Sequence, residues 1–110
     1  MRGKKVSRVA RKEIDLIVLA ARYDAEGGRL EIAQGRERRG PVWGDVRLFE
    51  REDLLDCIAE GKRVVAGRQA VLEGDFEVFG TIQPIGENDN KILVFEGKPS
   101  TVDELGVPLF

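Results

Sequence analysis

The ten residues Ile14–Tyr23, IDLIVLAARY, constrain the fold of this chain more than any other stretch. If they form a strand, both of its faces are apolar, because Leu16 and Val18 alternate with Ile17 and Leu19. A strand of this kind is covered on both sides by the rest of the molecule. A helix is the alternative, since leucine and alanine favour helices. The residues that follow favour the strand.

Two further strands are expected after this run. A pair of glycines leads into a segment in which the apolar residues Leu30 and Ile32 alternate with charged ones, a pattern typical of a β-hairpin. Residues 35–41, GRERRGP, are then expected as the next connection, and residues 42–49 as a third strand. Pro41 suits the start of that strand, where its missing N–H costs least.

The third strand is expected to turn its tryptophan outward. In a regular strand Trp43 and Arg47 share one face, while Val46 and Leu48 share the other. Since Val46 and Leu48 are expected to face the core, Trp43 is expected on the outer face beside Arg47.

The pattern changes after the third strand. Residues 52–60, EDLLDCIAE, place apolar side chains on one side of a helix and acidic ones on the other, and Gly61 suits its C-terminal cap. Strands are expected again over residues 62–66 and 76–82, with a sixth apolar run at residues 92–95. This order predicts a mainly β fold, a small OB-like or SH3-like barrel of five to six strands with one short helix after the third strand.

The charge is unevenly distributed along the 110 residues, whose net charge is −2. Residues 1–12 carry a charge of +6 and are expected to form a flexible basic arm, which leaves −8 on the rest. Residues 13–97 are expected to form the barrel domain, and residues 98–110 a C-terminal apolar tail. No apolar run approaches the roughly 18 residues that span a bilayer. Acidic residues interrupt any secretory signal, so a cytoplasmic location is expected.

The absence of histidine and the single cysteine, Cys57, exclude several chemistries. The chain has no histidine base, no Ser–His pair, no HExxH zinc motif and no internal disulfide. Cys57 lies beside the apolar side of the expected helix, where a cysteine acts as a small hydrophobic residue. Neither a P-loop nor a dinucleotide-binding glycine motif is present. The sequence therefore predicts a protein that is not an enzyme, with no catalytic residues, metal site or cofactor.

The stretch GRERRGPVW, residues 35–43, concentrates three arginines and the only tryptophan. Arginine binds phosphate groups with two parallel hydrogen bonds, and an aromatic side chain offers a stacking surface to bases. The cations of the arm would add electrostatic contacts to a nucleic-acid backbone. The predicted nucleic-acid-binding residues are Arg36, Arg38, Arg39, Trp43 and Arg47, together with Lys4, Lys5 and Arg8 of the arm.

Other interpretations of these features stay open. The arginines are also typical of a solvated loop, with Trp43 covered by the helix, the arm or a second subunit, and the acidic body would repel phosphate. The apolar Leu109 and Phe110 either pack back on their own domain or insert into a neighbour. The sequence thus predicts a non-catalytic binding module, with nucleic acid as the first partner. The alternative is a protein-interaction or homo-oligomeric module that acts through Trp43 or the Leu109–Phe110 tail; no membrane partner is expected.

Overall fold

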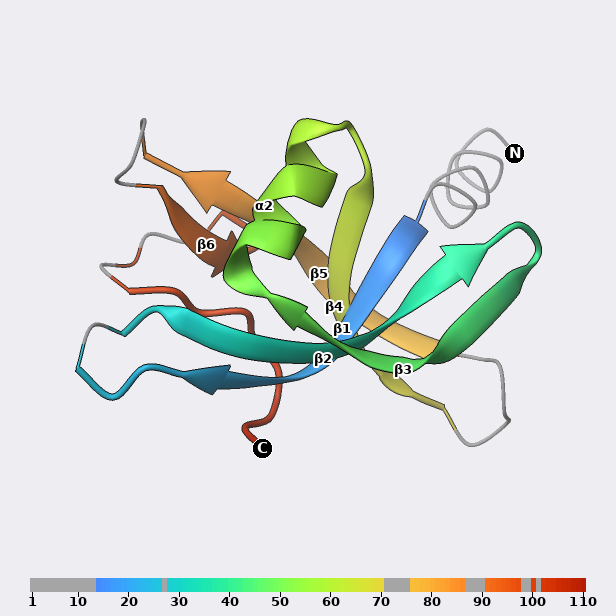
Figure 1. The fold of residues 1–110 in the computed structure, drawn as a ribbon, viewed down its shortest axis with the longest axis horizontal. Helices are drawn as coiled ribbons and strands as arrows, with labels where there is room; N and C mark the ends of the chain where they lie inside the picture. The colour runs from blue at the N-terminus through green and yellow to red at the C-terminus, as the bar shows by residue number, and fades with distance from the viewer. Residues whose placement is uncertain (1–13, 27, 71–75, 87–90, 98–99, 101) are drawn as a thin grey trace.

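The computed structural model describes residues 14–26, 28–70, 76–86, 91–97, 100 and 102–110. Within these residues the chain forms a six-stranded mixed sheet with the strand order β3-β2-β1-β4-β5-β6 and one short helix after the third strand (Figure 1). The prediction of a mainly β fold with one helix at this position is confirmed. The elements are β1 (Ile14–Tyr23), β2 (Leu30–Arg39), β3 (Val42–Glu50), α2 (Arg51–Ala59), β4 (Arg63–Gln69), β5 (Phe76–Ile85) and β6 (Ile92–Phe95).

The sheet has two edges, β3 and β6, and no strand pairing joins them within the described residues. The expected barrel is therefore not confirmed. At the centre, β1 pairs antiparallel with β2 and parallel with β4. A parallel pair requires a long crossover connection, and here β2, β3 and α2 provide it.

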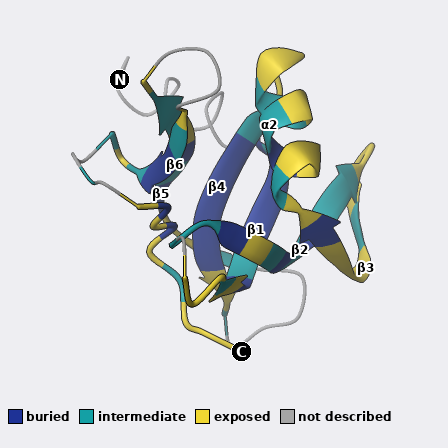
Figure 2. Ribbon diagram, turned by 60° about the vertical axis from the view of Figure 1, so that its left-hand side comes forward, coloured by how far each residue is buried: buried dark blue, intermediate teal, exposed yellow. Residues whose placement is uncertain are grey.

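β1 is buried on both of its faces, as its sequence predicts. Leu16 and Val18 pack with Leu54 of α2 in the larger of two core clusters, on the side of the sheet that we call the α2 face. Ile17 packs with Val65 in a second cluster on the opposite side, which we call the Trp43 face. Figure 2 shows β1 and β4 buried at the centre and β3 exposed at the edge.

The sheet is strongly curled about the Trp43 face. The rings of Trp43 on β3 and Phe76 on β5 lie with their centroids 5.2 Å apart, although three strands separate β3 from β5 in the sheet. Register shifts in the pairings of β1, β2 and β4 increase the local twist and bring these distant strands together. Gly67 of β4 lies inside the curl, where a Cβ atom would collide with the carbonyl oxygen of Glu77 and lie 2.8 Å from Cδ1 of Ile17.

The expected helix is confirmed as α2, which begins and ends one residue earlier than expected. At its start the side chain of Asp53 accepts a hydrogen bond of 2.8 Å from the N–H of Glu50, the N-cap residue. Leu54 is fully buried against the sheet, and Gly61 follows the helix with a φ of +89°. No helix in the described part of the chain is long and apolar enough to cross a membrane.

The end of the chain lies on its own sheet. Asp103 and Leu105 are buried, and Glu104 forms a parallel bridge with Val94 on the outer side of β6. Further on, the N–H of Ala21 donates to the carbonyl oxygen of Pro108 at 2.9 Å, so the last residues extend the sheet beside β1. The backbone of the tail therefore lies on its own chain, while the side chains of Leu109 and Phe110 stay 73% and 39% exposed.

Candidate functional site

The arginines that were expected in a loop lie on a strand. β2 continues to Arg39, and only Gly40 and Pro41 form the turn that leads into β3. The prediction of a loop over residues 35–41 is therefore wrong. Gly40 adopts a φ of +62°, which permits a tight hairpin turn, and the charged residues before it pair with β3 as ordinary strand residues.

A bulge in β3 changes which side chains share a face. Arg36 pairs with Val46 and Arg38 with Trp43, so a step of three residues on β3 faces a step of two on β2. Because directly opposed residues of an antiparallel pair lie on the same face, Trp43 lies with Val46, and Arg47 lies on the other face. The expectation that Trp43 lies beside Arg47 is wrong, because it assumed an unbroken strand.

The core residue of β3 also differs from the one expected. Val46 and Leu48 are 49% and 58% exposed, whereas Phe49 is 5% exposed and belongs to the core on the α2 face. Trp43 is partly buried against Phe76 and the core cluster of the Trp43 face. The tryptophan therefore packs within its own chain and does not stand as a free stacking surface.

Two of the predicted arginines accompany Trp43. Nε of Arg36 donates to the carbonyl oxygen of Gly44 at 2.7 Å, and its guanidinium carbon lies 5.7 Å from the centroid of the Phe76 ring, a cation–π arrangement. Nε of Arg38 donates to the carbonyl oxygen of Gly40 at 2.8 Å. The structure thus brings Arg36, Arg38 and Trp43 to one face of the hairpin.

The other predicted residues are not part of this group. Arg47 lies on the α2 face, where it forms an ion pair of 3.0 Å with Glu37 and lies 5.3 Å from the centroid of the Phe49 ring. Arg39 follows Arg38 directly and therefore points to the opposite face. Lys4, Lys5 and Arg8 lie outside the described residues, as does the whole predicted arm.

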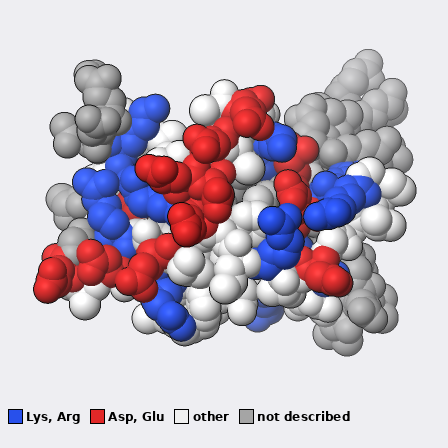
Figure 3. Space-filling model, in the orientation of Figure 1, with Lys and Arg blue, Asp and Glu red and all other residues white. Residues whose placement is uncertain are grey.

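Opposite charges gather on neighbouring parts of the surface. Figure 3 shows acidic side chains over α2 and a basic group over the β2–β3 hairpin beside it. The exposed acidic residues of the helix and its C-cap are Glu52, Asp53, Asp56 and Glu60. The basic end of the hairpin is therefore bordered by negative charge on the α2 face.

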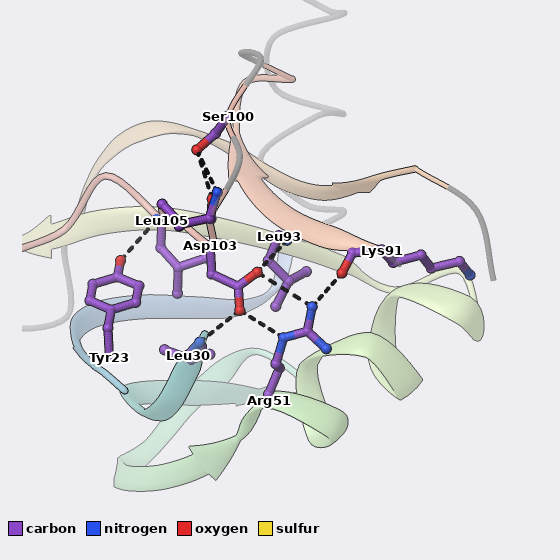
Figure 4. A network of polar contacts seen from close by, with 9 residues as sticks. Tyr23, Leu30, Arg51, Lys91, Leu93, Ser100, Asp103 and Leu105 are labelled. Atoms are coloured by element: carbon purple, nitrogen blue, oxygen red, sulfur yellow. Dashed lines mark hydrogen bonds and ion pairs between the residues drawn. The ribbon is translucent and has the colours of Figure 1, made fainter. Parts of the chain in front are cut away.

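A polar network that the sequence did not predict centres on Asp103 (Figure 4). Its Oδ2 accepts hydrogen bonds from the N–H of Leu30 at 2.6 Å and from Nε of Arg51 at 2.7 Å, and its Oδ1 accepts one from the N–H of Leu93 at 2.9 Å. Arg51 also donates to the carbonyl oxygen of Lys91. The network joins β2, α2, β6 and the end of the chain.

The environment of Asp103 favours its charged form. Burial by itself raises the pKa of this carboxyl group, but the hydrogen bonds from Arg51 and from the N–H groups of Leu30 and Leu93 outweigh burial and hold the pKa below its usual value. All of its partners belong to the fold, so Asp103 stabilises the structure. No local sequence signal marks it, because Arg51 lies 52 residues away along the chain.

Cys57 lines a shallow cleft between α2 and the hairpin, together with Glu37 and Lys62. Burial raises the pKa of the Cys57 thiol. The charge of Lys62 lowers this pKa, and the neighbouring carboxylates raise it, so that the pKa stays above its usual value. The thiol is therefore held in its protonated, unreactive form. Within the described residues, no group of three acidic or cysteine side chains is placed to hold a metal ion.

The outer edge of β3 carries exposed apolar side chains. Val42 on this strand is 60% exposed, and Val46 and Leu48 are exposed as well. The side chain of Asp45 is exposed too and makes no hydrogen bond or ion pair with another described residue. Edge strands are usually protected from pairing with another chain by charges, proline or bulges; β3 combines a bulge and charges with exposed apolar residues, which makes its edge a candidate contact surface.

No family model, curated protein or solved structure matches this chain. The candidate surfaces, the β3 edge and the arginine side of the hairpin, therefore rest on the geometry of the chain itself.

Proposed function

We propose that the protein is a non-catalytic binding module that holds another polypeptide along the outer edge of β3. The observation that carries this proposal is the exposed apolar set Val42, Val46 and Leu48 on an edge strand of nine residues. The unpaired backbone groups of such an edge offer hydrogen bonds to an added strand, and the side chains select its sequence. Because Val46 and Leu48 are only about half exposed in the single chain, their burial in the complex would contribute at most about 1 kcal/mol each.

A selection of random peptides displayed on phage tests this function. We expect the wild-type protein to enrich extended peptides that no longer bind the variant V46K/L48K. The control is Val78→Lys, which places one such lysine at an exposed valine on β5, on the same face of the sheet but away from the β3 edge. Failure to enrich any peptide, or equal binding to V46K/L48K, would contradict the proposal.

Nucleic-acid binding is the second candidate function. It is supported by the position of Arg36 and Arg38 on the same face of the hairpin as Trp43 and Phe76, so that cations and aromatic rings adjoin. Phosphate groups would contact the arginines at the exposed end of the hairpin, and Lys4, Lys5 and Arg8 would add further charge.

Titration with a fluorescent single-stranded oligonucleotide at about 50 and about 200 mM salt tests this candidate. We expect R36Q/R38Q to weaken binding and to lower the salt dependence by about one unit of slope for each lost phosphate contact. Arg47→Gln serves as the control, because Arg47 lies on the opposite face. Absence of binding at the lower salt concentration would rule this candidate out.

A further inference from the structure

We propose that the polypeptide held by β3 is the same strand of a second copy of this chain, paired antiparallel about a two-fold axis at Val46. This inference rests on the proposed function, because it names the partner of the same edge. In this dimer the charges of Asp45 and Arg47 set the register of the two strands.

The β3 edge is the longest unpaired sheet edge in the described structure, since on β5 the side facing away from β4 is unpaired only over residues 76–80. The other edge strand, β6, has four residues, and its outer side is occupied by the end of the chain. There the N–H of Glu104 donates to the carbonyl oxygen of Leu93 at 2.8 Å. By contrast, β3 pairs only with β2 among the described strands, and no described residue pairs with its other side along nine residues.

The charges on β3 distinguish among the three central registers, those centred on Asp45, Val46 and Arg47. A two-fold axis normal to the sheet keeps both copies of β3 with the same face up, so each residue on the regular side of the bulge, from Asp45 to Arg47, lies opposite one of its own face. The register centred on Val46 sets Val46 against the partner's Val46, and Asp45 against the partner's Arg47 on both sides of the axis. A centre at Asp45 or at Arg47 would place like charges directly opposite, which destabilises a strand pair.

The state of these side chains in the single chain agrees with this arrangement. Asp45 is exposed and has no partner among the described residues, while the Arg47 side chain is 51% exposed and bound on one side by Glu37. In the dimer the guanidinium group would lie between Glu37 of its own chain and the partner's Asp45.

The charges and the apolar residues have different roles in the dimer. Exposed ion pairs add little affinity, so the two Asp45–Arg47 pairs set the register. The affinity comes from backbone hydrogen bonds and from the burial of Val46 and Leu48, which continue one apolar strip across the axis.

Sedimentation velocity of the full chain from about 1 to about 100 µM tests the proposal. We expect the wild type to dimerise within this range. Asp45→Arg sets arginine against Arg47, and Arg47→Asp sets aspartate against Asp45, so each should weaken dimerisation at least tenfold, or about 1.4 kcal/mol. The double variant D45R/R47D restores opposite charges and should return the dissociation constant to within about threefold of the wild type.

Arg68→Asp is the matched control for Arg47→Asp. It breaks a comparable exposed ion pair, Arg68 with Glu77, but on β4 and β5, away from the β3 edge. We expect this variant to dimerise like the wild type. Because the exchanged side chains are exposed, each variant should fold, and circular dichroism verifies this before the masses are compared.

Three results would overturn the proposal. They are a monomeric wild type at the highest concentration, a dimer that neither single exchange weakens, and folded single variants whose loss the double variant does not repair. A monomeric wild type that still selects peptides sensitive to V46K/L48K would refute the second copy as partner and leave the proposed function intact. A monomeric wild type without such peptides would refute both.

Discussion

Nε of Arg51 lies 2.7 Å from Oδ2 of Asp103 and so ties the first residue of α2 to the final segment of the chain. The side chain of Asp103 is completely buried, and that of Arg51 is 18% exposed. Because the carboxylate also accepts two backbone hydrogen bonds, it satisfies donors from β2 and β6 as well as the guanidinium group. Breaking such a pair leaves several buried groups without partners, which costs far more than an exposed ion pair.

Replacement of Asp103 by alanine should therefore destabilise the protein strongly. We expect a loss of about 3 kcal/mol or more in the free energy of unfolding, because Arg51 and the N–H groups of Leu30 and Leu93 lose their acceptor. Urea unfolding followed by circular dichroism measures the loss. Asp56→Ala, on the exposed side of α2, should change the stability by less than about 0.5 kcal/mol. Equal effects of the two substitutions would contradict this role of Asp103.

The lowered pKa of Asp103 predicts a particular dependence of stability on pH. The folded structure stabilises the charged carboxylate of Asp103 relative to the unfolded chain, in which the pKa of an aspartate is about 3.9. The contribution of Asp103 is therefore present above about pH 4 and is lost as the pH falls through the lower pKa of the folded state. Asp103→Asn lacks this titration, so its unfolding free energy should fall less steeply than that of the wild type between about pH 4 and pH 2. Parallel curves for the two proteins would refute the prediction.

The only tyrosine offers a second test at the opposite end of the pH scale. The hydroxyl group of Tyr23 accepts a hydrogen bond of 3.0 Å from the N–H of Leu105. Burial raises the pKa of Tyr23 above its usual value of 10.0. The hydrogen bond from Leu105 lowers the pKa, and the nearby carboxylates raise it, so that the pKa stays above the usual value. The unfolded chain thus ionises first, and the stability from Tyr23 is lost as the pH rises from about 10 through the raised pKa.

Absorbance of the tyrosinate ion as a function of pH measures this pKa directly. Tyr23→Phe should lose about 1–2 kcal/mol of stability at neutral pH, because the buried N–H of Leu105 loses its acceptor. The variant should also lack the alkaline decrease in stability that the wild type shows. An ordinary tyrosine titration in the folded wild type would contradict the prediction.

The fold could be predicted from the sequence wherever the signal was local. The two-sided apolar run of β1, the amphipathic pattern of α2 and the strand order around the helix all appear within short windows of residues. The structure of the β2–β3 hairpin could not be predicted in this way, because the bulge between Trp43 and Val46 exists only in the pairing of two strands. The end of β2 could not be predicted for a related reason. Both faces of the hairpin lie near solvent there, so the residues from Arg36 to Arg39 are all charged and show no alternation typical of a strand.

The candidate site was only partly predictable, again for physical reasons. Arg36, Arg38 and Trp43 were expected together and lie together, but Arg47 was assigned to their face because regular alternation was assumed. The exposed edge of β3 was not predicted, because valine and leucine, the residue types at positions 46 and 48, are typical of a core. Only the order of strands in the sheet reveals that they lie on an unpaired edge.

The contact between Trp43 and Phe76 predicts a clear spectroscopic response. Trp43 is the only tryptophan, so the tryptophan fluorescence reports on its surroundings, of which the Phe76 ring is part. Phe76→Leu removes the edge-to-face partner and should cost about 1 kcal/mol, shift the emission to longer wavelength and increase quenching by acrylamide. Phe79→Leu, at an exposed position of the same strand, is the control and should leave the spectrum unchanged. An unaltered spectrum in Phe76→Leu would show that the sheet does not curl in solution as described.

The parallel pairing of β1 with β4 also determines how the chain can assemble during synthesis. The N–H of Arg63 donates to the side chain of Asp15 across this pair, over a separation of 48 residues. At roughly 10 residues per second, β1 leaves the ribosome about 5 s before its parallel neighbour. During that interval β2 can protect only one side of the most apolar strand. A nascent chain of this protein is therefore most vulnerable to aggregation before β4 emerges, and chaperone binding should be concentrated in that window.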